Sequence, residues 1–337
     1  MQPTIRDVAK HAGTSTSTVS RVLTRQGPVA DETRRRIQVA IAELGYKPNA
    51  LARGLVQKRS GTMGVVLPNV ANPFYAEVLR GMGDVAAAHG FNLLLVNSDL
   101  SFNKEAEGLA LLREKQVDGV IYTSGVVTPA HREIFLQLRR PVVLAATCDL
   151  EGTFPGVLVD SHKGARMAME HLADLGHRRI AVINGPQSDS IAGLERWKGY
   201  RDGAHSRGLQ LSAALVAEGT DYRLETGYLT MSRILNGKEI PSAVVAACDL
   251  LAIGAMNAII DRGLNVPSDI SVVGFDNIWL AAAVRPALTT VAQPMYEIGT
   301  RAVSLLAQAV AGQSEAVTDW IQPHLEIRTS TAPCTRG

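Results

Sequence analysis

The feature that most constrains the fold is an alternation of short apolar runs with amphipathic segments, which begins at Thr62 and fills most of the chain. The runs are uninterrupted Val, Ile, Leu and Ala, as is typical of strands buried on both faces of a parallel sheet. Predicted strands are Met63–Leu67, Leu93–Val96, Val117–Tyr122, Val142–Ala145, Ile180–Ile183, Ala243–Ala246 and Ile270–Phe275. Predicted helices are Tyr75–His89, Lys104–Lys115, His162–Leu175, Leu194–Arg207, Glu225–Leu235 and Leu250–Arg262. The alternation predicts an α/β fold in two halves that divide near Asp160.

The charges of the chain are unevenly distributed. Residues 1–60 contain 11 Lys and Arg against 4 Asp and Glu, whereas the remaining residues contain 23 against 28. The 337 residues are too many for one ordinary core, so we expect two or three domains, of which the first is small and basic. A small basic module attracts a polyanion such as nucleic acid.

Several classes of protein are disfavoured by composition. No run of about 18 uncharged apolar residues is present, and the N-terminus lacks the apolar core of a signal peptide, so we expect a cytoplasmic protein with no membrane span. The three cysteines, Cys148, Cys248 and Cys334, are odd in number and widely spaced, which fits a reducing compartment. No metal-ligand spacing or catalytic motif is recognised, and we expect neither a cofactor nor a catalytic residue.

The basic module begins with a pattern that predicts two short helices joined by a tight turn. Thr4 and Asp7 predict a capping box at the start of the first helix, and Gly13 predicts its end. Ser15 is placed to cap a second helix with an apolar inner face. The outer face of this second helix carries Thr16, Ser17, Ser20 and Arg21. Such a face suits a helix that reads the major groove, although an ordinary helical hairpin with a polar surface is the alternative.

A third helix and a basic connecting segment complete the module. The third helix is predicted over Asp31–Leu44 and ends at Gly45. Arg34, Arg35 and Arg36 on it either meet phosphates or form a solvated charge run. The segment from Asn49 to Leu55 is either a plain linker or a hinge that becomes helical only against a partner. In the second case Leu55 is suited to wedge between base steps in the minor groove.

Taken together, these segments resemble the LacI/GalR (lac-repressor/gal-repressor) family of bacterial transcription regulators. The matching stretches are TIRDVAKHAG, STVSRVL, VADETRRRIQVAIAELGYKPNALARGL, GVVLPNVANPFYAEVLRGM, VDGVI, HLADLGHRRIAVINGP, ERWKGY, CDLLAIGAM, GLNVPSDISVVGFDN and PALTTVAQPMYEIGTRAV. The resemblance implies an α/β protein with an N-terminal three-helix helix-turn-helix headpiece (1–47), a hinge helix and linker (48–61), and a two-lobed body (62–337) similar to periplasmic binding proteins, with parallel sheets flanked by helices. Lobe 1 would comprise about 62–160 and 292–320, and lobe 2 about 161–291 and 321–330.

The resemblance also implies the residues that contact DNA and a small-molecule effector. Expected DNA contacts are Thr4, Ser15, Thr16, Ser17, Ser20 and Arg21 in the headpiece and Asn49, Ala52, Arg53 and Leu55 in the hinge. Expected effector contacts are Asn72, Phe74, Tyr75, Arg196, Tyr222, Asp249, Asp276 and Gln293. Phe74 and Tyr75 are alternatively lobe packing, and Asp249 is alternatively a helix cap.

Two departures from the family pattern bear on the effector. Many sugar-binding relatives carry an Asp-Arg pair where this chain has Ala146-Thr147, and many have Asn where this chain has Cys248. Both changes remove polar groups, which predicts an effector less hydroxylated than a simple pentose or hexose, or one bound in another orientation.

The resemblance implies a sequence-specific DNA-binding regulator, most simply a homodimeric repressor on a near-palindromic operator, whose affinity depends on a sugar or sugar-derived effector. The chain ends in Thr, Pro and Gly after Arg328, so a dimer is expected rather than a tetramer. An enzyme is the first rival, since Gly81–Ala86 matches a dinucleotide fingerprint, but it falls inside a predicted helix. A transport-type solute-binding protein is the second.

Overall fold

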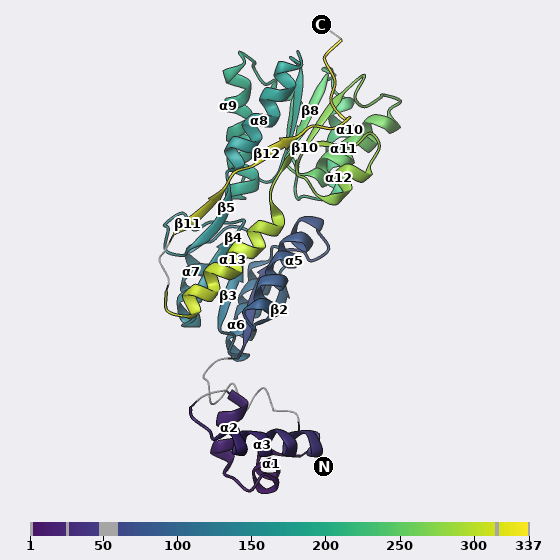
Figure 1. Cartoon of the computed structure of the whole chain (residues 1–337). Coiled ribbons are helices and arrows are strands. Elements are labelled where there is room, and N and C mark those ends of the chain that lie inside the picture. Colours follow the sequence, from purple (N-terminus) through teal and green to yellow (C-terminus); the bar gives the residue numbers. More distant parts are fainter. Residues whose placement is uncertain (1–2, 25–26, 47–59, 314–316, 336–337) are drawn as a thin grey trace. The chain divides into compact units, whose positions relative to one another are not determined.

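The computed structural model describes residues 3–24, 27–46, 60–313 and 317–335, in two compact units (Figure 1). The first unit contains the described residues up to Thr62 together with Gln116–Asp118, and the second contains Met63–Lys115 and the described residues from Gly119 onward. We call the helices of the first unit the headpiece and the second unit the body.

The headpiece consists of three helices, α1 (Ile5–His11), α2 (Thr16–Thr24) and α3 (Asp31–Leu44). Val8, Val19 and Ile37, one from each helix, are completely buried and form the centre of its small core. The capping box predicted at Thr4 is present, because the Asp7 amide donates to the Thr4 side chain and the Thr4 amide donates to the Asp7 carboxylate. Gly13 adopts φ +62°, a left-handed conformation that favours glycine and lets the chain turn between α1 and α2.

One six-stranded sheet forms the first lobe of the body, with strand order β11-β5-β4-β3-β1-β2. Its strands are β1 (Thr62–Leu67), β2 (Asn92–Asn97), β3 (Gly119–Tyr122), β4 (Val142–Ala145), β5 (Gly156–Val159) and β11 (Thr318–Ile321). The associated helices are α5 (Pro73–Ala88), α6 (Phe102–Glu114), α7 (Pro129–Leu138) and α13 (Met295–Val310). The pairs β1–β3, β3–β4, β4–β5 and β5–β11 are parallel, as predicted from the uninterrupted apolar runs.

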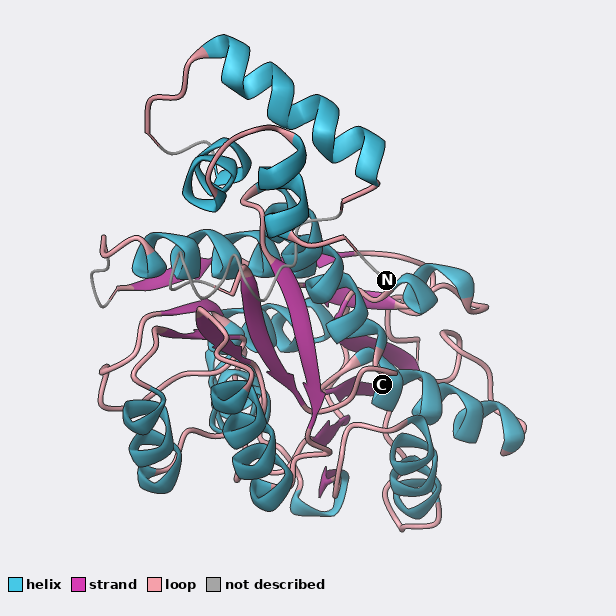
Figure 2. Ribbon diagram, turned by 90° about the horizontal axis from the view of Figure 1, so that it is seen from below, coloured by secondary structure: helices cyan, strands magenta, loops and turns pink. Residues whose placement is uncertain are grey.

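A second six-stranded sheet forms the other lobe, with strand order β12-β10-β9-β8-β6-β7. Its strands are β6 (Ile180–Asn184), β7 (Val216–Glu218), β8 (Ala243–Ala246), β9 (Ser271–Asp276), β10 (Thr289–Ala292) and β12 (His324–Glu326). The accompanying helices are α8 (Ser161–Asp174), π-helix η1 (Ser190–Glu195), α9 (Arg196–Ser206), 3-10 helix η2 (Ala213–Leu215), α10 (Leu224–Leu235), α11 (Asp249–Asp261) and α12 (Trp279–Ala283). Helices flank the strands of the body (Figure 2). The chain passes between the two sheets after β5, after β10 and after β11.

Two glycines explain how α5 and α13 pack closely in the first lobe. A Cβ on Gly81 of α5 would lie 2.1 Å from the Tyr296 carbonyl oxygen, and one on Gly299 of α13 would lie 2.0 Å from the Val78 carbonyl oxygen. Only glycine permits this approach of two backbones. Gly81 belongs to the stretch that resembles a dinucleotide fingerprint, and the structure places it within a helix at this crossing.

The seven predicted strands and six predicted helices are all present, with ends that differ by at most two residues. Five strands, β5, β7, β10, β11 and β12, and three α-helices, α7, α12 and α13, were not predicted from the sequence. All five of these strands have only three or four residues, and β12 (His-Leu-Glu) carries little apolar signal. Within the described residues, none of the helices has the length and apolar character that a membrane span requires. The domain limits stay predictions, because residues 47–59 lie outside the described ranges.

Candidate functional site

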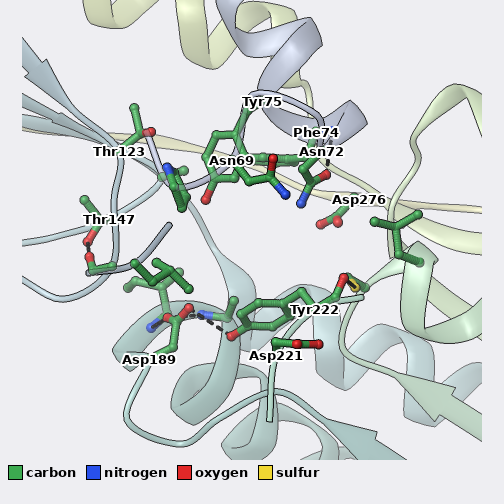
Figure 3. Close-up of a pocket in the computed structure, with 18 of the residues that line it drawn as sticks. Asn69, Asn72, Phe74, Tyr75, Thr123, Thr147, Asp189, Asp221, Tyr222 and Asp276 are labelled. Carbon is green, nitrogen blue, oxygen red and sulfur yellow. Dashed lines mark hydrogen bonds between the residues drawn. The ribbon is translucent and has the colours of Figure 1, made fainter. Parts of the chain in front are cut away.

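The body contains a cavity of about 420 Å³ at the carboxyl ends of strands from both sheets (Figure 3). This volume lies in the usual range for small-molecule sites, about 300–1,000 Å³. Seven of the eight predicted effector residues line it: Asn72, Phe74, Tyr75, Arg196, Tyr222, Asp276 and Gln293. The structure therefore brings together residues that lie up to 221 positions apart in the sequence.

Asp276, Arg196 and Gln293 form a buried polar group at one end of the cavity. Asp276 ends β9, and its Oδ1 accepts a 2.7 Å hydrogen bond from Gln293 Nε2 and lies 3.6 Å from Arg196 Nη1. Burial raises the pKa of Asp276 to about 6, although Arg196 and the Gln293 hydrogen bond both act to lower it. The carboxylate is thus held ionised at neutral pH at an energetic cost, which is common at binding sites.

Besides Asp276, two neighbours fix the position of Arg196. This first residue of α9 is 5% exposed, donates from Nη1 to the Ala247 carbonyl oxygen, and stacks with its guanidinium carbon 3.7 Å from the centre of the Phe275 ring. Its Nε is buried and has no hydrogen-bond partner in the described part of the chain. A buried donor of this kind is costly unless a ligand satisfies it.

Aromatic side chains also line the cavity. Phe74 and Tyr75, in the first turn of α5, pack edge to face at 5.0 Å, and Tyr222 approaches from the other lobe (Figure 3). The Tyr222 hydroxyl donates to Asp189 Oδ2 at 2.9 Å. Burial raises the pKa of both tyrosines, so both phenols stay protonated. Asn72 caps α5 by accepting the Phe74 amide at 3.0 Å, which leaves its amide nitrogen oriented as a donor.

The sequence analysis missed further polar residues of the cavity wall. They are Asn69, Asp99, Thr123, Thr147, Asp189, Thr220, Asp221 and Arg223. Asn69, Asp99, Thr123 and Thr147 each follow the end of a strand of the first sheet by one or two residues. Polar residues directly after buried parallel strands are the signal that would have found them. The prediction of an effector that is less hydroxylated than a simple sugar, or bound in another orientation, stays a prediction.

Asp249 is placed differently from the prediction. It is completely buried and does not line the cavity. Its Oδ1 accepts from the Thr290 hydroxyl at 2.5 Å and its Oδ2 from the Ile278 amide at 2.8 Å, so Asp249 joins α11 to the segments after β9 and within β10. Nor does Asp249 cap the helix, because the N-cap of α11 is Cys248, whose Sγ accepts from the Leu251 amide.

Backbone strain is concentrated at the cavity. Among the described non-glycine residues with positive φ, Asp99 (53°), Leu100 (57°), Ala146 (56°) and Asp276 (117°) all line it. Each such conformation costs about 1–3 kcal/mol and persists only where the surroundings hold it. The coincidence of strain, buried charge and polar lining makes this cavity the candidate binding site of the body.

The headpiece presents the predicted polar face of α2. Thr16, Ser17 and Arg21 are exposed and Ser20 is half-buried, whereas Val19 and Val22 face the core. The Ser15 hydroxyl accepts from the Thr18 amide at 3.2 Å and therefore caps α2, and Thr4 is engaged in the capping box of α1. The predicted hinge contacts, Asn49, Ala52, Arg53 and Leu55, lie outside the described residues.

Comparison with known proteins identifies both parts of the chain. Residues 4–49 match bacterial regulatory proteins of the lacI family, and residues 169–331 match the periplasmic binding protein-like domain. Catabolite control protein A of Priestia megaterium is 40% identical over 332 residues, which cover 98% of this chain and 100% of that protein.

Two solved structures are similar over nearly the whole chain. The structure of the transcriptional regulator CelR–cellobiose complex is 32% identical, covers 97% of this chain and 99% of its own, and has a TM-score of 0.75. The structure of the lac repressor dimer bound to operator and the anti-inducer ONPF is 27% identical, covers 98% and 100%, and has a TM-score of 0.87. The relatives are transcriptional regulators and not enzymes. The chain belongs to the lacI family of bacterial transcriptional regulators, with a helix-turn-helix headpiece and a periplasmic-binding-protein-like body.

Proposed function

We propose that the protein is a homodimeric repressor whose affinity for a near-palindromic operator is controlled by an uncharged sugar bound in the cavity. The observation that supports this most is that both sheets contribute to the cavity wall. A ligand there contacts both lobes, so its binding energy depends on their arrangement. The similarity to a lac repressor dimer bound to operator supports a dimer, and a two-fold dimer requires a site with two-fold symmetry.

The effector class follows from the charges of the cavity wall. Four aspartates, Asp99, Asp189, Asp221 and Asp276, line it against only two arginines. Both arginines already face carboxylates, since Arg196 lies 3.6 Å from Asp276 and Arg223 lies 3.5 Å from Asp221. A phosphate or carboxylate on the ligand would meet an excess of negative charge.

Uncharged hydroxyl groups suit this wall better. Carboxylates accept hydrogen bonds from hydroxyls, the Asn69 and Asn72 amides donate to them, and aromatic side chains cover the apolar face of a sugar ring. The name of the CelR complex states that this relative binds cellobiose, a neutral sugar.

DNA recognition is assigned to the headpiece and the hinge. Arg21 on the exposed face of α2 is long enough to fork onto a guanine in the major groove, while Thr16 and Ser17 read through short contacts, methyl groups or water. Leu55 in the hinge is assigned to the minor groove as a wedge. Effector binding changes lobe closure and thereby the spacing of the two hinges. A coupling of about 1–3 kcal/mol, or about 5- to 150-fold in affinity, is normal for such linkage.

A thermal-shift panel tests the effector class. The full-length protein is heated with cellobiose, D-glucose and D-ribose, and with D-glucose 6-phosphate and D-glucuronate as anionic counterparts. A ligand at about 100 times its Kd stabilises the folded state by about 2.7 kcal/mol, so a true effector raises Tm clearly. We expect a shift with a neutral sugar and none with the anions. A larger shift with the phosphate than with glucose would overturn the assignment.

Operator selection tests the DNA assignment. A pool of random duplexes is enriched on the full-length protein, and the winners are measured by fluorescence anisotropy at several salt concentrations. We expect an inverted repeat whose affinity falls steeply with salt, because phosphate contacts release counterions. No salt-sensitive binding to any duplex at low ionic strength would refute the proposal.

A further inference from the structure

A buried polar network lies directly behind the first-lobe wall of the cavity. It consists of Ser98, Glu105, Ser124 and His131, all at most 4% exposed. None of them lines the cavity, yet Ser98 precedes Asp99 and Leu100, and Ser124 stands between Thr123 and Gly125, all four of which do. Thr123 is seen on this side of the cavity in Figure 3.

The hydrogen bonds of the network have one consistent direction. The Thr128 amide donates to His131 Nδ1 at 3.2 Å, so the ring proton sits on Nε2 and is donated to Glu105 Oε2 at 2.8 Å. Ser124 donates its hydroxyl to Glu105 Oε1 at 2.5 Å. The only proton of Ser124 is then used, and Ser98 must donate to Ser124 in their 2.7 Å contact.

The network ends at the strained turn of the cavity wall. Ser98 Oγ accepts the Leu100 amide at 3.3 Å, and Asp99 and Leu100 are the two consecutive residues with φ of 53° and 57°. Lys104, next to Glu105 in α6, holds the same turn from outside through a 2.5 Å bond from its Nζ to Asp99 Oδ2. Two adjacent residues of α6 therefore hold the Asp99–Leu100 turn. Lys104 contacts it directly, and Glu105 is connected to it through the two serines.

Aromatic side chains pack against the network. Phe102 packs edge to face on His131 at 4.9 Å, and Tyr122 lies 5.6 Å from the same ring. Burial raises the pKa of Glu105, but the hydrogen bonds from His131 and Ser124 outweigh burial and hold the pKa below its usual value. An ionised acceptor in a water-poor setting strengthens every hydrogen bond that leads to it.

We propose that Glu105 is a positioning residue of the effector site, whose carboxylate fixes the turn at Asp99–Leu100 and the segment around Thr123 through Ser124 and Ser98. The inference rests on the proposed function only in that the cavity is the effector site. The carboxylate is required because it accepts two hydrogen bonds, one on each oxygen, from His131 and from Ser124. The carboxamide of glutamine accepts from one neighbour but presents an N–H to the other, so the Ser124 hydroxyl must accept instead of donate, and the Ser98 hydroxyl loses its acceptor in Ser124.

Hydrogen exchange on the full-length protein tests the positioning role without any ligand. The variant is Glu105→Gln, and its matched control is Glu107→Gln, an exposed residue of the same helix. We expect the amides of segments 98–101 and 123–125 to exchange about ten-fold faster in Glu105→Gln. This factor corresponds to the loss of one charge-assisted hydrogen bond. Strand β3 and the control should match the wild type. Unchanged exchange in both segments would overturn the proposal.

A second variant separates positioning from general damage and covers a failure of Glu105→Gln to fold. Ser124→Ala removes the link between Glu105 and Ser98, so it should loosen the Asp99–Leu100 segment to a similar extent. The double variant should be no looser there than either single variant, because both cut the same chain of hydrogen bonds. If the increases in exchange rate of the two single variants add in the double variant, Glu105 and Ser124 do not act through the same chain of hydrogen bonds, and the proposal is contradicted.

Cellobiose binding completes the test. Glu105→Gln should bind cellobiose about ten-fold more weakly than Glu107→Gln, with operator affinity in the absence of sugar unchanged. Equal cellobiose affinity in the two variants would overturn the positioning role. If the wild type binds no sugar, the proposed function fails, and the exchange data still decide what Glu105 does.

Discussion

Replacing Asp276 by asparagine should stabilise the protein at neutral pH while weakening its effector site. The carboxylate is buried, and burial raises its pKa from 3.8 to about 6 despite the nearby Arg196. Above pH 6 the folded state therefore carries an ionised group that it disfavours relative to the unfolded chain. Asparagine has nearly the same shape, and its oxygen still accepts from Gln293, so it removes the charge but keeps the 2.7 Å hydrogen bond.

The magnitude follows from the shift in pKa. About two pH units correspond to about 3 kcal/mol at pH 7.5, as an upper limit. Because the folded pKa is the higher one, the folded state binds more protons between pH 4 and 6, and the penalty fades as pH falls through this window. At pH 4.5 the advantage of the variant should shrink to about 1 kcal/mol. In a body of this size about 3 kcal/mol corresponds to a rise in Tm of about 6 °C.

Thermal unfolding of the wild type and of Asp276→Asn at pH 7.5 and 4.5 measures this directly. Asp84→Asn is the control, because Asp84 is exposed and accepts a hydrogen bond from the Tyr296 hydroxyl. Effector affinity of Asp276→Asn should fall about 10- to 150-fold, the usual worth of a hydrogen bond to a charged group. A variant that is less stable than the wild type at pH 7.5, or equally stabilised at both pH values, would refute the reasoning.

Three further substitutions probe the headpiece, the hinge and the helix crossing. Arg21→Ala should cost about 1–3 kcal/mol of operator affinity in an anisotropy titration and relax specificity at one base position. Leu55→Ala should weaken operator binding far more than binding to random DNA, and equal losses on both would rule out the wedge. Gly299→Ala should lower stability by about 1–3 kcal/mol in urea unfolding, because its Cβ would lie 2.0 Å from a backbone oxygen, whereas Gly83→Ala, with nothing within 4 Å, should not.

The buried framework was predictable because its signal is local. Each strand of five or six residues contains an apolar run and most long helices are amphipathic, so periodicity was enough to find these elements, whereas the 16-residue helix α13 was missed. The short strands β7 and β12 carry mixed residues in three positions, and only their neighbours in the sheet make them strands. Near the C-terminus the chain crosses from the second sheet to the first between β10 and β11 and returns between β11 and β12. These crossings depend on tertiary pairing of strands, which periodicity does not encode.

The cavity was predictable only in part, for a physical reason. Arg196 and Asp276 belong to stretches whose residue types match a known pattern, so the resemblance located them. Asp249 belongs to such a stretch too, but Thr290 and Ile278 satisfy its oxygens inside the core, which no local pattern reveals. Asp189 and Asp221 reach the wall through loops whose course depends on the packing of the second lobe.

In the proposed mechanism, binding of the ligand in the cavity changes the affinity of the protein for its operator. The most direct measurement is the affinity of the full-length protein for its selected operator, by fluorescence anisotropy, with and without a saturating concentration of the sugar that raises Tm. We expect operator affinity to change by about 5- to 150-fold. An operator affinity that is the same with and without the bound sugar would contradict this mechanism.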